Sequence, residues 1–224
     1  MTSIPDDTEA SAAQIAARLG GALTGSDVVS DEALELVRAA RRLVEAVVMT
    51  DVDPAAREAA AEALDRVTAS LRSQRREGAV LLVRHADGRI EHLTQAGSGR
   101  LNPQAPDIVF EGLGGPPPVP TPVELIARCT LTPSHGGPPG RVHGGQVAAL
   151  LDEVVGFAAF VAGAPGMTVS LTVRYREPTP HRVPLEVRAR LDRWEGRKRW
   201  VSGEVVAAGR VTAEAEAFLL GAPA

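Results

Sequence analysis

The chain has 224 residues, a length that suits one good-sized domain or a small domain with an accessory piece. Apolar residues make up 44% of it and aromatic residues only 3%, so a packed core must be built from valine, leucine and alanine. The formal net charge of -4 gives no reason to expect a nucleic-acid partner, and the single cysteine excludes an internal disulfide.

The start of the chain bears on where the protein works. Its first ten residues are polar and acidic, unlike the basic and then apolar start of a secretory signal. No apolar run reaches the roughly 18 residues that a membrane span needs. A lone free thiol fits a reducing compartment. We therefore expect a cytoplasmic protein without a membrane partner.

Residues 1–77 predict a helical region. Ser30 is suited to cap a helix start, and the two acidic residues after it favour the positive end of the helix dipole. Apolar residues recur at helical spacing as far as Val48, and a second helix restarts at Pro54, since proline suits a first turn. Each helix has one apolar stripe, and two stripes that face one another indicate an antiparallel hairpin. A further helix is expected over residues 8–19.

Residues 78–120 are predicted to form a linker. Two short apolar runs, over residues 80–83 and 89–93, flank Asp87-Gly88, a pair typical of a two-residue hairpin turn. The later stretches are rich in glycine and proline, which excludes regular structure there. We expect this linker to lie across the domain that follows.

From residue 121 the chain alternates between apolar and polar residues. Such alternation predicts strands with one buried face. The predicted strands cover residues 123–131, 167–175, 185–191, 201–207 and 211–219. Short connections between the last three favour an antiparallel meander.

One helix is predicted between the first two of these strands, from Gly145 to about Phe160. It is apolar on nearly every side, which is typical of a helix buried inside a domain. A strand, a buried helix and then four antiparallel strands describe a curved sheet wrapped around one central helix. The fold class expected for residues 121–222 is therefore α+β.

Asp152 lies in the middle of that apolar helix. A buried carboxylate is costly unless it is paired or used, so its position indicates either a functional acid or a structural ion pair. Glu153 lies about 100° further round the helix and is expected to be the exposed member of the pair.

The residues before the helix, His143-Gly144-Gly145, form a second candidate feature. Glycines let a backbone approach a ligand, and the first N–H groups of a helix have no partner inside it. These donors, with the helix dipole behind them, suit a carbonyl oxygen that becomes an oxyanion. The alternatives are an ordinary glycine-rich helix start and a histidine that braces the loop.

The distance between the two features adds a prediction. Gly144 and Asp152 are about 12 Å apart along a helix that rises roughly 1.5 Å per residue, so they cannot touch one carbonyl group within a single chain. If both serve one reaction centre, a two-fold axis must bring the donor of one subunit to the carboxylate of another. The sequence therefore predicts an obligate homodimer, alone or as a dimer of dimers.

These features resemble the PaaI-type hotdog-fold acyl-CoA thioesterases over about residues 120–220. The resemblance rests on the His-Gly-Gly motif, the aspartate nine residues after its histidine, the strand from Met167 to Tyr175, and Pro178. It implies a hotdog fold for this region. It also implies that Asp152 is the catalytic acid or base, that Gly144 donates its N–H to the thioester carbonyl, and that His143 lies beside it.

The resemblance implies further roles on the next strand. Thr168 matches a hydroxyl position that orients the attacking water, and Ser170 is a second candidate because alternation places it on the same strand face. Gly145 is expected to contact the substrate at the helix start. Arg174 and Arg176 are expected to meet the phosphates of CoA, with a solvated strand face as the alternative.

The implied reaction is hydrolysis of an acyl-CoA to the free acid and CoA, with Asp152 as general base or covalent nucleophile. No cofactor is expected apart from the CoA of the substrate. No metal is expected either, because the histidines and Cys129 lack metal-ligand spacing. Two alternatives stay open: a hotdog protein that binds acyl-CoA without hydrolysing it, and a hotdog dehydratase or hydratase that uses His143 with a carboxylate.

Overall fold

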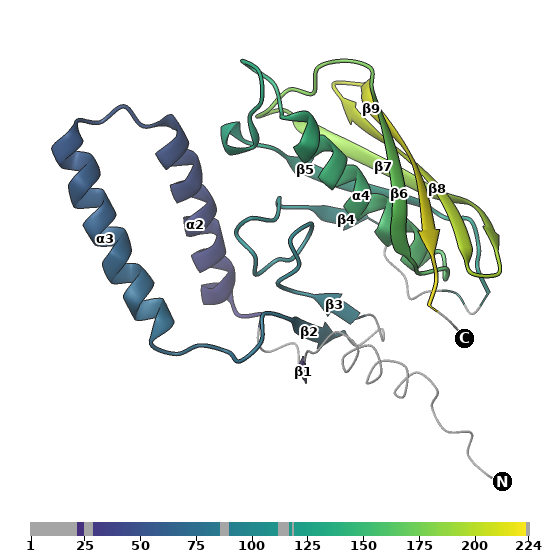
Figure 1. The fold of residues 1–224 in the computed structure, drawn as a ribbon, viewed down its shortest axis with the longest axis horizontal. Helices are drawn as coiled ribbons and strands as arrows, with labels where there is room; N and C mark the ends of the chain where they lie inside the picture. The colour runs from purple at the N-terminus through teal and green to yellow at the C-terminus, as the bar shows by residue number, and fades with distance from the viewer. Residues whose placement is uncertain (1–21, 25–28, 86–89, 112–116, 118, 223–224) are drawn as a thin grey trace, which may run out of the picture.

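The computed structural model describes residues 22–24, 29–85, 90–111, 117 and 119–222 (Figure 1). The helix predicted over residues 8–19 and the Asp87-Gly88 turn lie outside the described residues. The elements in chain order are β1 (Ala22–Thr24), α2 (Asp31–Met49), α3 (Pro54–Arg72), β2 (Leu81–Arg84), β3 (Ile90–His92), β4 (Val109–Glu111), β5 (Glu124–Thr130), η2 (Pro133–His135), α4 (Gly144–Val161), β6 (Met167–Tyr175), β7 (Pro184–Glu195), β8 (Lys198–Ala207) and β9 (Arg210–Leu220).

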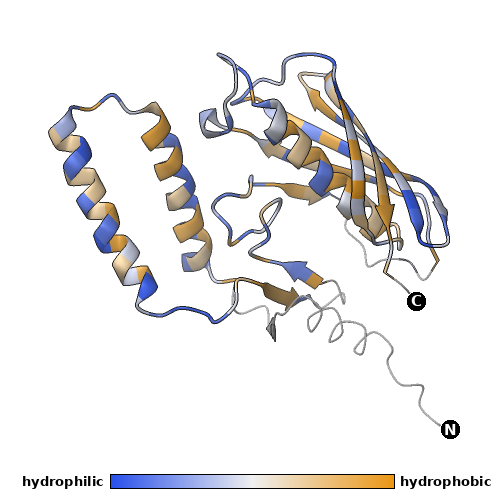
Figure 2. Ribbon diagram, viewed as in Figure 1, coloured by the Kyte–Doolittle hydropathy of each residue, from blue (hydrophilic) through white to orange (hydrophobic). Residues whose placement is uncertain are grey.

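Both N-terminal helices begin at the residues that the sequence predicts. The Ser30 hydroxyl accepts a hydrogen bond from Ala33 N at 3.3 Å, and the Asp53 carboxylate accepts one from Ala56 N at 2.8 Å. The two helices run antiparallel as a hairpin beside the rest of the molecule (Figure 1). Their apolar stripes, however, form no core, because α3 buries none of its residues and α2 buries only Val37. Apolar positions therefore stay on the surface of both helices (Figure 2).

The linker region contains a small sheet with the order β1-β2-β3. β2 and β3 pair antiparallel, which confirms the hairpin predicted on either side of Asp87-Gly88. β1 joins β2 in parallel, a pairing that the sequence did not predict. β4 also lies in the predicted linker and adds a strand to the larger sheet by pairing with β5.

The larger sheet has six strands in the order β4-β5-β7-β8-β9-β6, and all its neighbours are antiparallel. It curves around α4, as Figure 1 shows. The five strands predicted after residue 121 are all present, and the α+β hotdog fold is confirmed.

The core lies between α4 and the concave face of the sheet. A glycine on β8 brings the two layers close together, because a Cβ on Gly203 would lie only 2.9 Å from Val155 Cγ1. The buried residues of α4 are Val147, Leu150, Leu151, Val154, Val155, Ala158, Ala159 and Val161. Burial of this face is the main source of stability for the domain, since each fully buried aliphatic side chain contributes about 1.5–3 kcal/mol.

Two expectations about α4 are corrected. The helix is 18 residues long and apolar enough to span a membrane by length and composition, although we expected no such run; its packing against the sheet accounts for its apolar character. It is also not buried on every side. Asp152 is exposed in the single chain, and Glu153 is the half-buried member of the pair, so the expected burial of these two acids is reversed.

β6 also differs from the expected strand with one buried face. It lies at an edge of the sheet and pairs only with β9 among the described strands. Met167 is 79% exposed, Val169 58% and Tyr175 55%. The edge position thus leaves apolar side chains of this strand exposed in the single chain.

Candidate active site

The start of α4 is held in place by the loop before it. His143 is the N-cap residue, and its ring nitrogen Nδ1 accepts a hydrogen bond from Gly145 N at 3.0 Å. The backbone of the loop is fixed as well, because His143 N donates to His135 O and Val142 N donates to Thr179 O, both at 2.9 Å. The histidine therefore braces the loop and caps the helix, as one of the expected alternatives had it.

Gly144 is the first residue of the helix, and β6 holds it from the other side. The hydroxyl of Tyr175 donates to Gly144 O at 2.8 Å. A Cβ at position 144 would lie 3.2 Å from the tyrosine ring, so a glycine gives the ring room to pack here. The N–H of Gly144 has no hydrogen-bond partner among the described residues. The hydrogen bond to its carbonyl thus fixes Gly144, and its N–H stays available to donate to a ligand.

Gly145 does not share that freedom. Its N–H already donates to His143, so the structure leaves Gly144 as the better donor of the two.

A hollow of about 310 Å³ opens beside the helix start, lined by Pro138, Arg141, Val142, Gly144, Val147 and residues 175–179. Tyr175 was not among the predicted site residues, although it belongs to the strand motif that carries the resemblance.

Asp152 lies two turns further along α4. It is exposed, and its carboxylate has no hydrogen bond or ion pair within the described part of the chain. A separation of about 12 Å along the helix keeps it away from Gly144 of the same chain. The single chain therefore holds the donor and the acid of the predicted site but does not bring them together.

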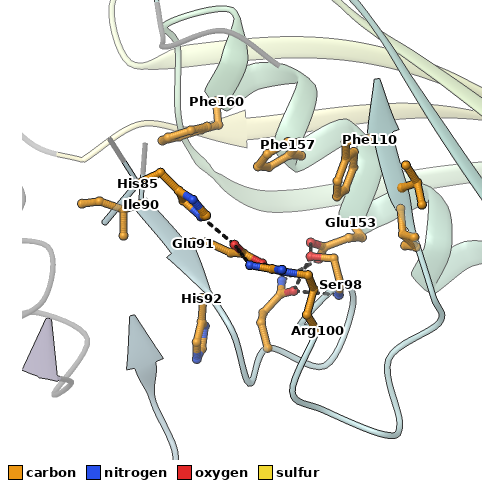
Figure 3. Close-up of a pocket in the computed structure, with 13 residues that line it drawn as sticks. His85, Ile90, Glu91, His92, Ser98, Arg100, Phe110, Glu153, Phe157 and Phe160 are labelled. Atoms are coloured by element: carbon orange, nitrogen blue, oxygen red, sulfur yellow. Dashed lines mark hydrogen bonds and ion pairs between the residues drawn. The ribbon is translucent and has the colours of Figure 1, made fainter. Parts of the chain in front are cut away.

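Glu153 has the partners that we expected for a buried acid. Its carboxylate accepts hydrogen bonds from Gln95 Nε2 and Ser98 Oγ, both at 2.5 Å (Figure 3). A Cβ on Gly97 would lie 2.2 Å from its Oε2, so the loop approaches the glutamate closely. These contacts confirm that the linker lies across the following domain. No pattern near Gln95 or Ser98 in the sequence predicts these contacts.

A bulge in β6 separates the two hydroxyl candidates. Thr168 pairs with Leu219, and Ser170 pairs with Phe218, with one residue of β6 inserted between the pairs. Leu219 is fully buried and faces α4, whereas Phe218 packs against Trp200 on the other face of the sheet. The expectation that Ser170 shares a face with Thr168 is therefore wrong, because the inserted Val169 reverses the alternation.

The comparisons with known proteins agree with this fold. The family model of the thioesterase superfamily matches residues 139–214, which include His143, Gly144, Asp152 and Thr168. A solved crystal structure of a thioesterase superfamily protein is 34% identical, covers 84% of this chain and 90% of its own, and superposes with a TM-score of 0.73. The chain belongs to the thioesterase superfamily.

Curated relatives match a shorter stretch. The acyl-coenzyme A thioesterase THEM4 of Rattus norvegicus is 36% identical over 84 residues, which are 38% of this chain and 36% of that protein. The acyl-coenzyme A thioesterase THEM5 of Homo sapiens is 38% identical over 83 residues, which are 36% of this chain and 34% of that protein. The chain thus spans about a third of the length of the curated relatives that it matches.

In this superfamily member, the two arginines expected to meet CoA phosphates are engaged in ion pairs. Arg174 Nη1 lies 3.1 Å from Glu216 Oε1, and Arg176 Nη2 lies 2.7 Å from Glu214 Oε2. The hydrogen bond to Glu214 raises the pKa of Arg176. Arg176 also lines the hollow beside Gly144, so a phosphate bound there would have to compete with Glu214.

The histidines and carboxylates form no metal centre in the described part of the chain. No group of three or more His, Cys, Asp or Glu side chains there is close enough to hold a metal ion. Cys129, the lone thiol, is buried in the core, and burial raises its pKa to about 12. It is therefore a core residue rather than a nucleophile.

Proposed function

We propose that this superfamily member is an acyl-CoA thioesterase, which hydrolyses an acyl-CoA to the free acid and CoA. The observation that carries the proposal is the start of α4. There, Tyr175 holds the carbonyl of Gly144 and His143 occupies the next N–H, which leaves one fixed donor. A rigid, unpartnered backbone N–H at a helix start suits the oxyanion formed when a thioester is attacked. The names of the curated relatives support the same reaction.

In the proposed reaction, the Gly144 N–H donates to the thioester carbonyl oxygen. Asp152 takes a proton from a water molecule whose oxygen attacks the carbonyl carbon, and the carbon–sulfur bond then breaks. CoA leaves as its thiolate and takes up the proton. Direct attack by Asp152, through a mixed anhydride, would use the same residues. Thr168, on the α4 side of the sheet, is proposed to hold the water, and no cofactor is needed beyond the CoA of the substrate.

Asp152 is proposed to act on the substrate bound by a partner subunit. Two features of the single chain support a homodimer. One edge of β6 has no partner strand among the described residues and carries exposed apolar side chains, and Asp152 shares its side of α4 with Gly145, Ala149 and Gly156. On that side, Gly156 has no atom within 4 Å of the position of a Cβ. Antiparallel packing of two α4 helices would bring Gly144 of one subunit beside Asp152 of the other.

The direct test is release of free thiol from short, medium, long and aryl acyl-CoAs. Asp152→Asn should lower kcat/KM by about 10²-fold or more, because it removes the base and keeps the shape of the side chain. Asp51→Asn, in the exposed loop between α2 and α3, is the matched control and should behave as the wild type. Unchanged circular dichroism would show that both variants fold. Binding of acyl-CoA by the wild type without any thiol release would instead favour the non-catalytic binding protein.

A second experiment tests the shared site. Gly144→Pro removes the N–H. The backbone accepts proline there because the position is the first residue of the helix and follows an extended His143 (φ -64°, ψ 135°), while the added Cβ requires a small shift of the Tyr175 ring. Gly144→Ala adds the same Cβ but keeps the N–H, and is the control. An equimolar, randomly reassociated mixture of Gly144→Pro and Asp152→Asn chains should regain about a quarter of wild-type activity, because half of the dimers are mixed and each mixed dimer has one intact site of two. No recovery in mixed dimers would place both residues in one subunit's site.

A further inference from the structure

A pocket of about 530 Å³ lies between α4 and the described residues 85 and 90–110, and the chemistry proposed above does not use it. Its volume falls within the roughly 300–1,000 Å³ typical of small-molecule sites. One wall is aromatic and belongs mainly to α4, and the other is polar and belongs to the segment between β2 and β4 (Figure 3). That segment lies before the matched thioesterase region of residues 139–214.

The pocket begins at Glu153, the residue that follows Asp152 in α4. Glu153, Phe157 and Phe160 line it, and their spacing of four and three residues places them on one face of α4. From Glu153 to Phe160 the helix rises by about 10 Å, directed away from Gly144. A thioester whose carbonyl lies beside Asp152 would therefore extend its acyl group along this face.

The aromatic wall is a row of three rings. The centroids of Phe110 and Phe157 are 4.3 Å apart, and those of Phe157 and Phe160 are 5.8 Å apart. A row of ring faces offers a long, narrow apolar surface, and its burial by an alkyl chain contributes about 0.8 kcal/mol for each methylene removed from water. The wall therefore fits an extended alkyl chain better than a single compact group.

Most hydrogen bonds of the polar wall join two residues of that same wall. Glu91 accepts from Arg100 Nε at 2.7 Å and Nη2 at 2.9 Å, and lies 2.7 Å from His85 Nε2. Burial alone would raise the pKa of Glu91, but Arg100 and His85 outweigh it and hold that pKa below its usual value. A paired carboxylate makes this wall a poor binding site for a second charge, so an uncharged acyl tail suits the pocket.

Glu153 fastens the polar wall to the helix. It accepts from Gln95 and Ser98, and the absence of a side chain on Gly97 lets the loop reach it. This latch of Gln95, Ser98 and Glu153 fixes the distance between the two walls beside Asp152. It is a positioning device, since none of its members needs to touch the reacting atoms.

We propose that this pocket receives the acyl group of the substrate, that the substrate is an acyl-CoA with an uncharged alkyl tail of medium length, and that the pocket-lining residues among positions 85 and 90–110 determine this specificity. The inference rests on the proposed function. It assigns a role to the accessory segment: the tail lies along Phe110, Phe157 and Phe160, and the latch holds the opposite wall in place.

The test compares kcat/KM for octanoyl-CoA and acetyl-CoA in the full chain. Phe157→Ala should lower the octanoyl-to-acetyl ratio by about tenfold or more, because only the longer tail reaches the rings. Phe157→Leu, which keeps an apolar side chain, should have a smaller effect and is the control for a loss of the fold in Phe157→Ala. Phe218→Ala, on the outer face of the sheet, is the matched control and should leave the ratio unchanged. An unchanged ratio in both Phe157 variants, with activity retained, would overturn the inference and leave the proposed function intact.

The latch has its own readout. The double variant Gln95→Ala/Ser98→Ala should raise KM for octanoyl-CoA with little change in kcat, and Ser98→Thr, which keeps the hydroxyl, should retain the wild-type KM. A fall in kcat for both substrates would show a general structural role instead and count against the latch.

Measurements of ligand binding can test the pocket even if the protein is not a thioesterase. If the wild type releases no thiol from any acyl-CoA, calorimetry with octanoyl-CoA and with CoA alone still tests the pocket. Tighter binding of octanoyl-CoA that Phe157→Ala abolishes would support the pocket, and equal binding of the two ligands would overturn it.

Discussion

The central helix α4 and the hairpin helix α3 have almost the same length, 18 and 19 residues, yet α4 buries eight residues and α3 buries none. Both begin at a residue with a good local cap. The difference comes from what lies opposite: a curved sheet in one case, and no covering layer among the described residues in the other. Local sequence signals place a helix, but only a facing layer turns its apolar stripe into core.

The attachment of the hairpin to the rest of the molecule is largely polar. Arg41 Nη1 lies 3.3 Å from Asp107, and Arg182 Nη2 lies 2.9 Å from Glu45. Exposed ion pairs of this kind contribute at most about 1 kcal/mol each. The hotdog core should therefore resist perturbation far more strongly than the hairpin, and four experiments test this difference.

The largest contrast should be in thiol reactivity. Cys129 is 7% exposed and burial raises its pKa to about 12, so at pH 8 an aromatic disulfide reagent should label it only when the core unfolds. A second thiol introduced by Leu71→Cys, at a half-exposed position of α3, should react faster by about 10³-fold or more, since native proteins are unfolded only about 10⁻³ of the time or less. Comparable rates for the two thiols would show that the core opens locally.

The next effect is on stability. Leu151→Ala should lower the free energy of unfolding by about 2–5 kcal/mol, because it leaves a cavity between α4 and Gly203 in a fully buried site. Urea unfolding followed by circular dichroism measures the change. A loss below 1 kcal/mol would mean that the sheet collapses around the cavity.

A smaller effect should come from pH at the junction of hairpin and core. His135 accepts a hydrogen bond from Thr132 N at 3.1 Å, and burial lowers its pKa. Because the native state favours the neutral ring, its stabilising contribution is complete above the unfolded-state pKa of about 6.5 and is lost as the pH falls through that value toward the lowered native pKa. We expect the free energy of unfolding to fall as the pH is lowered from about 7 to about 5.

The control for this pH effect is His135→Gln, which keeps an acceptor but does not titrate. Its unfolding free energy should depend less steeply on pH over the same window. An identical slope in the variant and the wild type would assign the pH dependence to other groups.

The smallest effect should come from the hairpin surface. Val67→Ala, at a position of α3 that is 52% exposed, should change the free energy of unfolding by no more than about 0.5 kcal/mol. The same urea titration gives the answer. A loss as large as that of Leu151→Ala would reveal that the apolar face of the hairpin is covered in solution.

Much of the fold could be predicted from the sequence because its signals are local. The cap at Ser30, the proline at position 54 and the period-two pattern after residue 121 each place an element correctly. The three-residue strands β1 and β4 could not be found, since so short a run has no period and forms only because a neighbouring strand offers free backbone groups.

The candidate site was predicted less completely, for a similar reason. The His-Gly-Gly motif and the helix start are local features, and both appear where expected. The burial of Asp152 and Glu153 was reversed, because it depends on a loop that reaches the helix from more than fifty residues earlier in the chain. The inserted Val169 was missed because a bulge reveals itself only in the pairing with β9.

The hydrogen bond from Gly145 N to His143 Nδ1 has a consequence for proton transfer. A ring nitrogen that accepts cannot carry a hydrogen, so the neutral imidazole of His143 is the Nε2–H tautomer. That form offers its outward nitrogen as a donor and cannot remove a proton from a substrate with it. Protonation would not restore a base and would end the cap on Gly145. In the proposed reaction His143 would therefore polarise an oxygen, and the removal of a proton would be left to a carboxylate.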